Sequence, residues 1–140
     1  MKQILQFFLL TSIILVSASC SRNSDNLSVN PGQAVVSGTW RVSLFKDSGN
    51  DETIDFAGYS FTFNTGGVLT VVKSSNTQNG TWNINSSSNK FSIDLGAKVT
   101  GNLPLGELTD DWKILSSSAT EIKLGDDNPS SNEFLTFTKN

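Results

Sequence analysis

The chain has 140 residues, which is enough for one domain. It contains no histidine and one cysteine, so Ser–His and Cys–His catalytic pairs, histidine metal sites and four-cysteine zinc sites are excluded. No disulfide can form within the chain, and a folded domain must therefore rely on packing. The net charge is −3 without a run of basic residues, which removes the electrostatic signature of nucleic-acid binding.

The N-terminus has the layout of a secretory signal peptide. A short positive start, Met1–Gln3, precedes the apolar run Ile4–Val16, which is too short for a membrane-spanning helix of about 20 residues. The small residues Ser17–Ser19 then lead into Cys20. This segment resembles the lipobox of bacterial lipoproteins, although Ser17 stands where leucine is usual. The resemblance implies that Cys20 is acylated and becomes the first residue of the mature protein. The alternative is ordinary signal-peptide cleavage, which leaves a free thiol.

These features divide the chain into three parts. Residues 1–19 are expected to be the signal peptide, residues 20–35 the lipidated cysteine and a flexible polar tether, and residues 36–140 the folded domain. Each buried methylene of an acyl chain contributes about 0.8 kcal/mol, and two or more chains anchor a protein stably. The expected partner is therefore a membrane. The expected location is the bacterial cell envelope, on the periplasmic or the outer face of the outer membrane.

From Ser37 onward apolar residues alternate with polar ones, which is the period of a strand buried on one side. Eight segments share this alternation: Trp40–Leu44, Tyr59–Phe63, Leu69–Val71, Trp82–Ile84, Phe91–Leu95, Trp112–Ile114, Ile122–Leu124 and Leu135–Phe137. Most connections between them are short and rich in Ser, Asn, Asp and Gly, which favours antiparallel pairing of neighbours. The sequence therefore predicts an all-β fold, an eight-stranded antiparallel up-and-down β-barrel.

Two connections, Lys46–Ala57 and Gly96–Asp110, are longer than the others. The second is expected to hold a short helical turn at Leu105–Leu108. Both run from an odd-numbered to an even-numbered strand, so they should lie at the same end of the barrel. Long loops in an otherwise tight meander often carry function. The alternative is that both loops only plug the barrel.

Four motifs follow one another along the predicted barrel. They are Ser37–Trp40, Thr53–Phe63, Asn79–Trp82 and Leu108–Ile114, with Gly-x-Trp in the first and Gly-Thr-Trp in the third. In this order they resemble the small lipocalin-like lipoproteins of Bacteroidota-type bacteria, over roughly residues 36–139. The resemblance implies a calycin-type barrel and does not indicate a ligand. The chain is shorter than a typical lipocalin and lacks the lipocalin disulfide.

Large aromatic residues are expected at inward positions. Eight strands enclose a space that side chains can just fill, so these residues should fill or close the barrel. The residues concerned are Trp40, Phe61, Trp82 and Trp112. Stacking of a ligand on the tryptophans is the alternative.

Acidic residues gather in the first long connection, namely Asp47, Asp51, Glu52 and Asp55. Carboxylate oxygens suit Ca²⁺, but the spacing does not match an EF-hand loop, and we expect a solvated acidic loop. No pair of carboxylates is placed on inward positions of neighbouring strands. The sequence therefore predicts no catalytic residue, no metal site and no cofactor, and hence a protein that is not an enzyme.

The last expectation concerns the place where a ligand or partner binds. Ile54, Phe56 and Tyr59, with Leu103 and Leu105 from the second long connection, are predicted to line the barrel mouth. In this interpretation the domain is a membrane-anchored binding module that captures a small apolar molecule or a peptide. The alternative is a structural or interaction lipoprotein that contacts another envelope protein through its loops or outer face. The sequence gives no indication of the oligomeric state.

Overall fold

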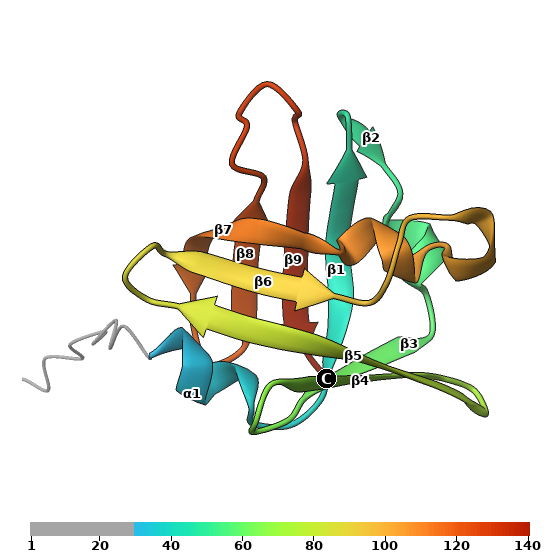
Figure 1. Ribbon diagram of the computed structural model, residues 1–140, viewed down its shortest axis with the longest axis horizontal. Helices are drawn as coiled ribbons and strands as arrows, with labels where there is room; N and C mark the ends of the chain where they lie inside the picture. The colour runs from blue at the N-terminus through green and yellow to red at the C-terminus, as the bar shows by residue number, and fades with distance from the viewer. Residues whose placement is uncertain (1–29) are drawn as a thin grey trace, which may run out of the picture.

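The computed structural model describes residues 30–140 (Figure 1). In chain order the elements are α1 (Pro31–Val35), β1 (Trp40–Asp47), β2 (Asn50–Asp51), the 3₁₀ helix η1 (Thr53–Phe56), β3 (Tyr59–Phe63), β4 (Val68–Lys73), β5 (Asn76–Asn85), β6 (Lys90–Asp94), the 3₁₀ helices η2 (Thr100–Asn102) and η3 (Leu105–Leu108), β7 (Asp110–Ser117), β8 (Glu121–Gly125) and β9 (Phe134–Lys139). The signal peptide, the acylation of Cys20 and the first part of the tether were expected at residues 1–29, which lie outside the described residues. Within residues 30–140 no helix is long and apolar enough to cross a membrane.

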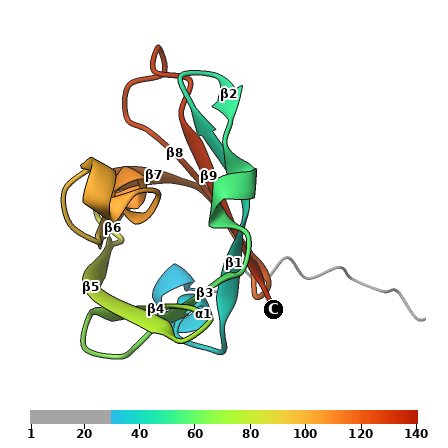
Figure 2. The same ribbon diagram turned by 90° about the vertical axis from the view of Figure 1, so that its right-hand side faces the viewer.

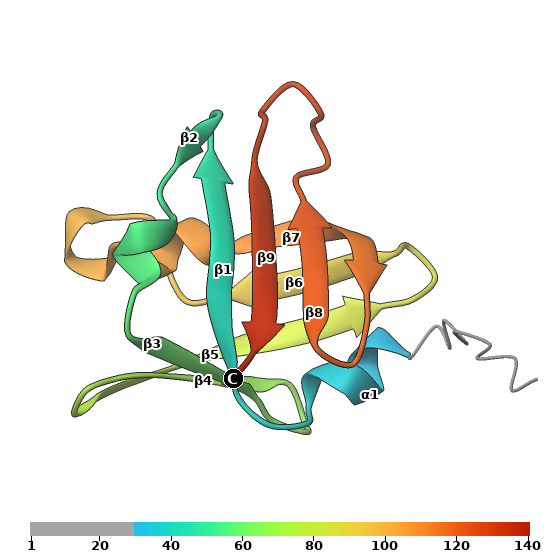
Figure 3. The ribbon, with the colours of Figure 1, turned by 180° about the vertical axis from the view of Figure 1, so that it is seen from behind.

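The strands form one antiparallel sheet that closes on itself (Figure 3). Each strand from β3 to β8 pairs with the next one along the chain, and β1 pairs with both β3 and β9. The short strand β2 folds back on the end of β1 as a hairpin and does not join the ring. The ring therefore consists of β1 and β3–β9, which are the eight segments that the alternation marked. The predicted eight-stranded antiparallel up-and-down barrel is confirmed.

The ring is least continuous between β1 and β3, which share one paired position, Trp40↔Phe61. Beyond this pair, η1 packs against β1. Phe56 of η1 meets Phe45 with ring centroids 5.1 Å apart. The Phe45 amide donates a hydrogen bond to Thr53 Oγ1 at 2.8 Å. At Phe45, where β3 does not pair with β1, the first long connection therefore provides the packing and the acceptor for the backbone amide.

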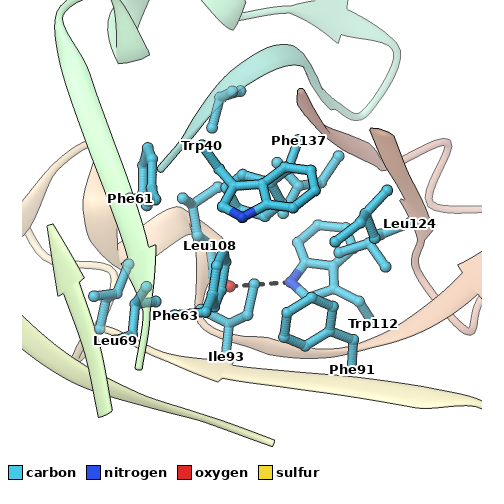
Figure 4. Packing of buried hydrophobic residues seen from close by; sticks show 14 of the residues in the cluster. Trp40, Phe61, Phe63, Leu69, Phe91, Ile93, Leu108, Trp112, Leu124 and Phe137 are labelled. Carbon is cyan, nitrogen blue, oxygen red and sulfur yellow. Dashed lines mark hydrogen bonds between the residues drawn. The ribbon is translucent and has the colours of Figure 1, made fainter. Parts of the chain in front are cut away.

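Aromatic side chains from several strands fill the barrel interior (Figure 4). Trp40 and Phe61 are 0% exposed and Trp112 is 1% exposed, so three of the four residues expected to fill or close the barrel are buried. Phe63 meets Phe91 and Phe137, each at a centroid distance of 5.4 Å. Tilted and edge-on contacts of this kind add to the burial of apolar area.

Two buried indoles form hydrogen bonds with α1 and η3, which lie at opposite ends of the barrel. Trp40 donates a hydrogen bond from Nε1 to the Val35 carbonyl of α1 at 2.8 Å. Trp112 donates from Nε1 to the Leu108 carbonyl of η3 at 3.0 Å (Figure 4). A buried indole N–H requires an acceptor, and each tryptophan finds one in the element that covers its end of the barrel.

The two ends of the barrel differ in what covers them. The helix end carries α1, which lies across the opening of the ring (Figure 2), and the turns at residues 64–67, 86–89 and 118–120. The loop end carries residues 48–58, 74–75, 95–109 and 126–133. Both long connections lie at the loop end, as the strand parity predicted, and Lys98 Nζ of the second is 2.6 Å from Asp47 Oδ2 at the end of β1. The helical turn expected at Leu105–Leu108 is η3.

The tether was expected to extend to residue 35, but residues 31–35 form α1. Pro31 occupies the first turn, and the Asn30 side chain accepts a hydrogen bond from the Gly32 amide at 3.0 Å. Val35 is 0% exposed and belongs to the hydrophobic core. The barrel domain therefore begins with α1 rather than at residue 36.

Two inward positions also differ from the alternation. Leu44 was expected to face the core, but a β-bulge between Val42 and Leu44 shifts the register and buries Phe45 instead. Trp82 was expected to be a buried core residue, but it is only partly buried. Its ring stands edge-on to Phe63 at 5.6 Å, and its Nε1 donates to the Asn64 carbonyl at 2.9 Å.

Candidate functional site

A pocket of about 230 Å³ opens at the loop end, between β3–β5 and the β6–β7 connection. The strands contribute inward positions, and their register places Tyr59 opposite Lys73 and Val71 opposite Gln78. The connection contributes Gly101, Asn102, Leu103 and Leu105. Strand pairing and one long loop thus bring together residues that lie up to 46 positions apart in the sequence.

The floor and the rim of this pocket differ in exposure. Val71 is 1% exposed and Leu105 is 5% exposed, so both belong to the buried floor. Leu103 is 49% exposed and stands at the rim, where Asn76 and Thr77 are also exposed. The pocket therefore has an apolar base and a mainly polar, solvent-accessible edge.

Two side-chain amides hold the β6–β7 connection against β5. Gln78 donates from Nε2 to the Leu95 carbonyl at 2.8 Å and to Asn102 Oδ1 at 3.0 Å. Asn102 donates from Nδ2 to the carbonyls of Leu95 at 3.0 Å and Ala97 at 2.9 Å. A Cβ at Gly106 would lie 2.4 Å from the Ala97 carbonyl oxygen, so only glycine allows the connection to fold back this closely. The wall of the pocket is thus fixed by hydrogen bonds rather than left as an open loop.

Lys73 is the cation of the pocket. Its Nζ lies 4.2 Å from the centroid of the Tyr59 ring, which is a cation–π contact. The Tyr59 ring is in turn tilted against Phe56 at 6.5 Å and Phe61 at 6.4 Å, and these contacts connect the pocket to the core. The side chain of Lys73 is therefore held over a ring whose position the packing of the core fixes.

A second group of charged residues lies at the loop end, and we call Asp47, Lys98, Glu107, Asp126 and Glu133 the loop-end charge cluster. The closure of the barrel explains the cluster, because pairing of Lys46 with Phe134 puts the end of β1 beside the start of β9. Lys98 Nζ is 2.6 Å from Asp47 Oδ2 and 3.7 Å from Glu107 Oε1. Lys98 thereby links β1 to the β6–β7 connection.

The pKa of Asp47 and the pKa values of Glu107 and Glu133 are shifted in opposite directions, because their surroundings differ. The hydrogen bond from Lys98, with help from the Ser48 hydroxyl, holds the pKa of Asp47 below its ordinary value. The same hydrogen bond raises the pKa of Lys98. Burial raises the pKa of Glu107. Burial, followed by a hydrogen bond with Asp47, raises the pKa of Glu133 to about 7, so Glu133 can exchange a proton near neutral pH.

The structure brings together three of the five residues predicted for the barrel mouth: Tyr59, Leu103 and Leu105 line the pocket. Phe56 is 2% exposed and packs in the core, and Ile54 is 78% exposed and does not line the pocket.

Sequence reasoning did not single out Lys73, Gln78 or Asn102. The alternation along β4 held a signal for the lysine, because Lys73 is the next residue in phase after Leu69 and Val71. The sequence held no comparable signal for the partnership of Gln78 with Asn102, which joins residues 24 positions apart.

A comparison with known proteins finds a solved structure that is similar to this chain. No protein-family model and no curated protein matches the chain. A crystal structure of a DUF4847 family protein from Bacteroides vulgatus ATCC 8482, determined at 1.00 Å resolution, is similar with a TM-score of 0.56. The similarity covers 77% of this chain and 96% of that chain, at 16% sequence identity. The two chains share a fold. At this identity the likeness carries no information about a ligand or an activity.

Proposed function

We propose that this protein is a lipid-anchored, lipocalin-like binding module of the bacterial cell envelope, which captures a small ligand at the loop end of its barrel. The observation that carries the proposal is the pocket between β3–β5 and the β6–β7 connection, with Val71 and Leu105 as its floor and Lys73 and Tyr59 on one wall. Acylation of Cys20, expected from the sequence, would keep the domain at a membrane surface.

The site of binding follows from how the interior is filled. Trp40, Phe61 and Trp112 occupy the centre of the barrel and are almost fully buried, so a ligand contacts the loop end rather than the barrel axis. Ligand pockets in proteins usually measure about 300–1,000 Å³, and this pocket measures about 230 Å³. The ligand is therefore a small molecule or one end of a larger one.

The same filled interior favours one alternative, in which the barrel is a solid scaffold that contacts another envelope protein. The two functions make different predictions for the pocket. A binding module takes up a small molecule between Lys73 and Leu105, whereas a scaffold leaves this pocket to solvent. In both functions the protein performs no catalysis.

The test is a titration of the isotope-labelled protein with a panel of neutral, anionic and cationic small molecules, followed by the backbone amide NMR signals. We expect at least one compound to shift the amides of Lys73, Gln78 and residues 101–105 in a saturable manner. Binding that shifts only amides at the helix end or on the outer faces of the strands would refute this site. A folded protein that binds no compound of the panel would favour the scaffold.

A pair of variants makes this test specific. Gly101 lines the pocket, and no heavy atom lies within 4 Å of a Cβ built there, so Gly101→Phe can place a ring in the pocket without a backbone clash. Val99 lies in the same connection, is 56% exposed and does not line the pocket, which makes Val99→Phe the matched control. Gly101→Phe should abolish the saturable shifts and Val99→Phe should retain them. Equal binding by the two variants would contradict the assignment.

A further inference from the structure

Lys73 occupies an unusual position for a charged residue. Along β4 the inward side chains are Leu69, Val71 and Lys73, so the lysine continues a face that is otherwise apolar and buried. It is partly buried and lines the pocket. Lys98 lies near the carboxylates of Asp47 and Glu107. By contrast, no carboxylate oxygen of residues 30–140 lies within 4.0 Å of the Lys73 ammonium.

The Tyr59 ring gives this ammonium only a modest stabilisation, because a cation over a tyrosine face is a weak interaction. The lysine also covers the ring, with its Nζ 4.2 Å from the centroid, so this face of Tyr59 is not available for stacking against a sugar. An anion in the pocket would give this ammonium an ion-pair partner.

The neighbouring donors limit which anion fits. Both Nε2 hydrogens of Gln78 are directed to Leu95 and Asn102, and both Nδ2 hydrogens of Asn102 are directed to Leu95 and Ala97. The pocket lining contains no arginine and no cation besides Lys73. A phosphate group is usually held by several charged or backbone donors, whereas a carboxylate can be held by one ammonium. Asn76 and Thr77 also line the pocket, but they are exposed at its edge. One cation, with the amides of Gln78 and Asn102 already occupied, therefore favours a single carboxylate.

The rest of the lining limits the remainder of the ligand. Val71 and Leu105 form an apolar floor, and Leu103 adds an apolar rim. With a volume of about 230 Å³, the pocket accommodates a short or branched hydrocarbon chain beside the carboxylate.

From these observations we infer that the pocket binds a small monocarboxylate with a short apolar chain, and that Lys73 pairs with the carboxylate. This inference rests on the proposed function and names the chemical class of its ligand. It differs from simple capture of an apolar molecule, because the charge of the head group decides binding.

Three compounds of nearly the same shape test the class: 3-methylbutanoate, 3-methylbutanamide and 3-methylbutylamine. Each is titrated into the labelled full-length mature protein, and the dissociation constant is obtained from the amide shifts of residues 73, 78 and 101–105. We expect the acid to bind about tenfold more tightly than the amide, because a hydrogen bond to a charged group is worth more than one between neutral groups. The amine should bind more weakly still. Inorganic phosphate, added to the protein that already holds the acid, should not displace the acid at equal concentration.

Two variants assign the preference to Lys73. Lys73→Met keeps the length of the side chain and removes its charge, so the acid and the amide should then bind equally. Lys113→Met removes the same charge from an exposed position on β7 outside this pocket, and should keep the preference of the wild-type protein. The comparison of the three compounds on the wild-type protein needs no variant and stands if Lys73→Met does not fold.

The outcomes separate this inference from the proposed function. Equal binding of acid and amide to the wild-type protein, tighter binding of the amine, effective competition by phosphate, or an unchanged preference in Lys73→Met would each overturn the monocarboxylate assignment. In these cases saturable binding of any compound at the pocket would still support the binding module. Absence of binding by all three compounds overturns the inference, and absence of binding by the whole panel overturns the proposed function as well.

Discussion

Glu133 should make the stability of the fold depend on pH between about 4.5 and 7. This carboxyl lies at the start of β9, beside Asp47 and Asp126, and burial together with the hydrogen bond to Asp47 raises its pKa from 4.5 to about 7. In this window the folded protein keeps a proton that the unfolded chain releases. The free energy of unfolding should therefore fall as the pH rises from about 4.5 to 7, and the contribution is lost above the folded-state pKa.

The size of the effect follows from the change in pKa. A rise from 4.5 to about 7 corresponds to about 3.4 kcal/mol at most. Because Glu133 is only partly buried, solvent screening should reduce this to about 1–2 kcal/mol. Asp47 acts in the opposite direction but at lower pH, since its lowered pKa contributes stability that is lost only as the pH falls below 3.8. The two contributions are therefore separable along the pH axis.

Urea unfolding followed by tryptophan fluorescence measures this dependence. Between pH 5 and pH 8 the midpoint should fall by about 0.3–2 M, given an m-value of about 1–3 kcal/mol per molar for a small domain. Glu133→Gln keeps a neutral side chain of the same shape and should show a smaller fall over this range, because Glu107, whose pKa is also raised by burial, still contributes. Glu121→Gln is the control, because Glu121 forms only a surface pair with Lys123 at 3.0 Å. Wild-type midpoints that are equal at pH 5 and pH 8, or a Glu133→Gln profile that matches the wild type, would refute the reasoning.

Two further predictions concern the core and the anchor. Trp40→Ala should destabilise the fold by about 3–5 kcal/mol, since it removes a fully buried ring and its hydrogen bond to α1. Trp82→Ala should destabilise it by about 1.5–3 kcal/mol, because this ring is only partly buried. Equal denaturant midpoints for the two variants would contradict this difference. Cys20→Ser should yield a soluble or an uncleaved protein in place of a membrane-attached one, as measured by fractionation and mass, and a variant that still requires detergent at its mature mass would show that the anchor lies elsewhere.

The strands could be predicted from the sequence because each is buried on one face, and a period of two is then visible without knowledge of the fold. The parity of the connections followed from the strand count alone, and it placed both long connections at the loop end. The position of η3 was also predictable, since Leu105 and Leu108 are apolar residues in a short segment between strands.

Other features depend on contacts that no local pattern reports. The bulge before Leu44 is set by the pairing of β1 with β9, a strand about 90 residues further along the chain, so the burial of Phe45 was not predicted. Residues 31–35 follow a polar segment of the sequence. Their helix is held by the burial of Val35 in the core and by the hydrogen bond from Trp40 Nε1 to the Val35 carbonyl. Phe56 is an apolar residue of the first long connection, as expected of a residue at the barrel mouth. It packs instead against Phe45 in the core, beside the place where β1 and β3 share one paired position.

The position of α1 also determines how the domain is presented at a membrane. The described chain enters through α1 at the helix end, the pole opposite the pocket. Ten residues join Cys20 to Asn30, which is at most about 36 Å of fully extended chain. If Cys20 is acylated as proposed, the anchor is attached to the domain at the helix end, which is opposite the pocket. In the proposed binding module, the pocket would then be open to ligands from the aqueous phase.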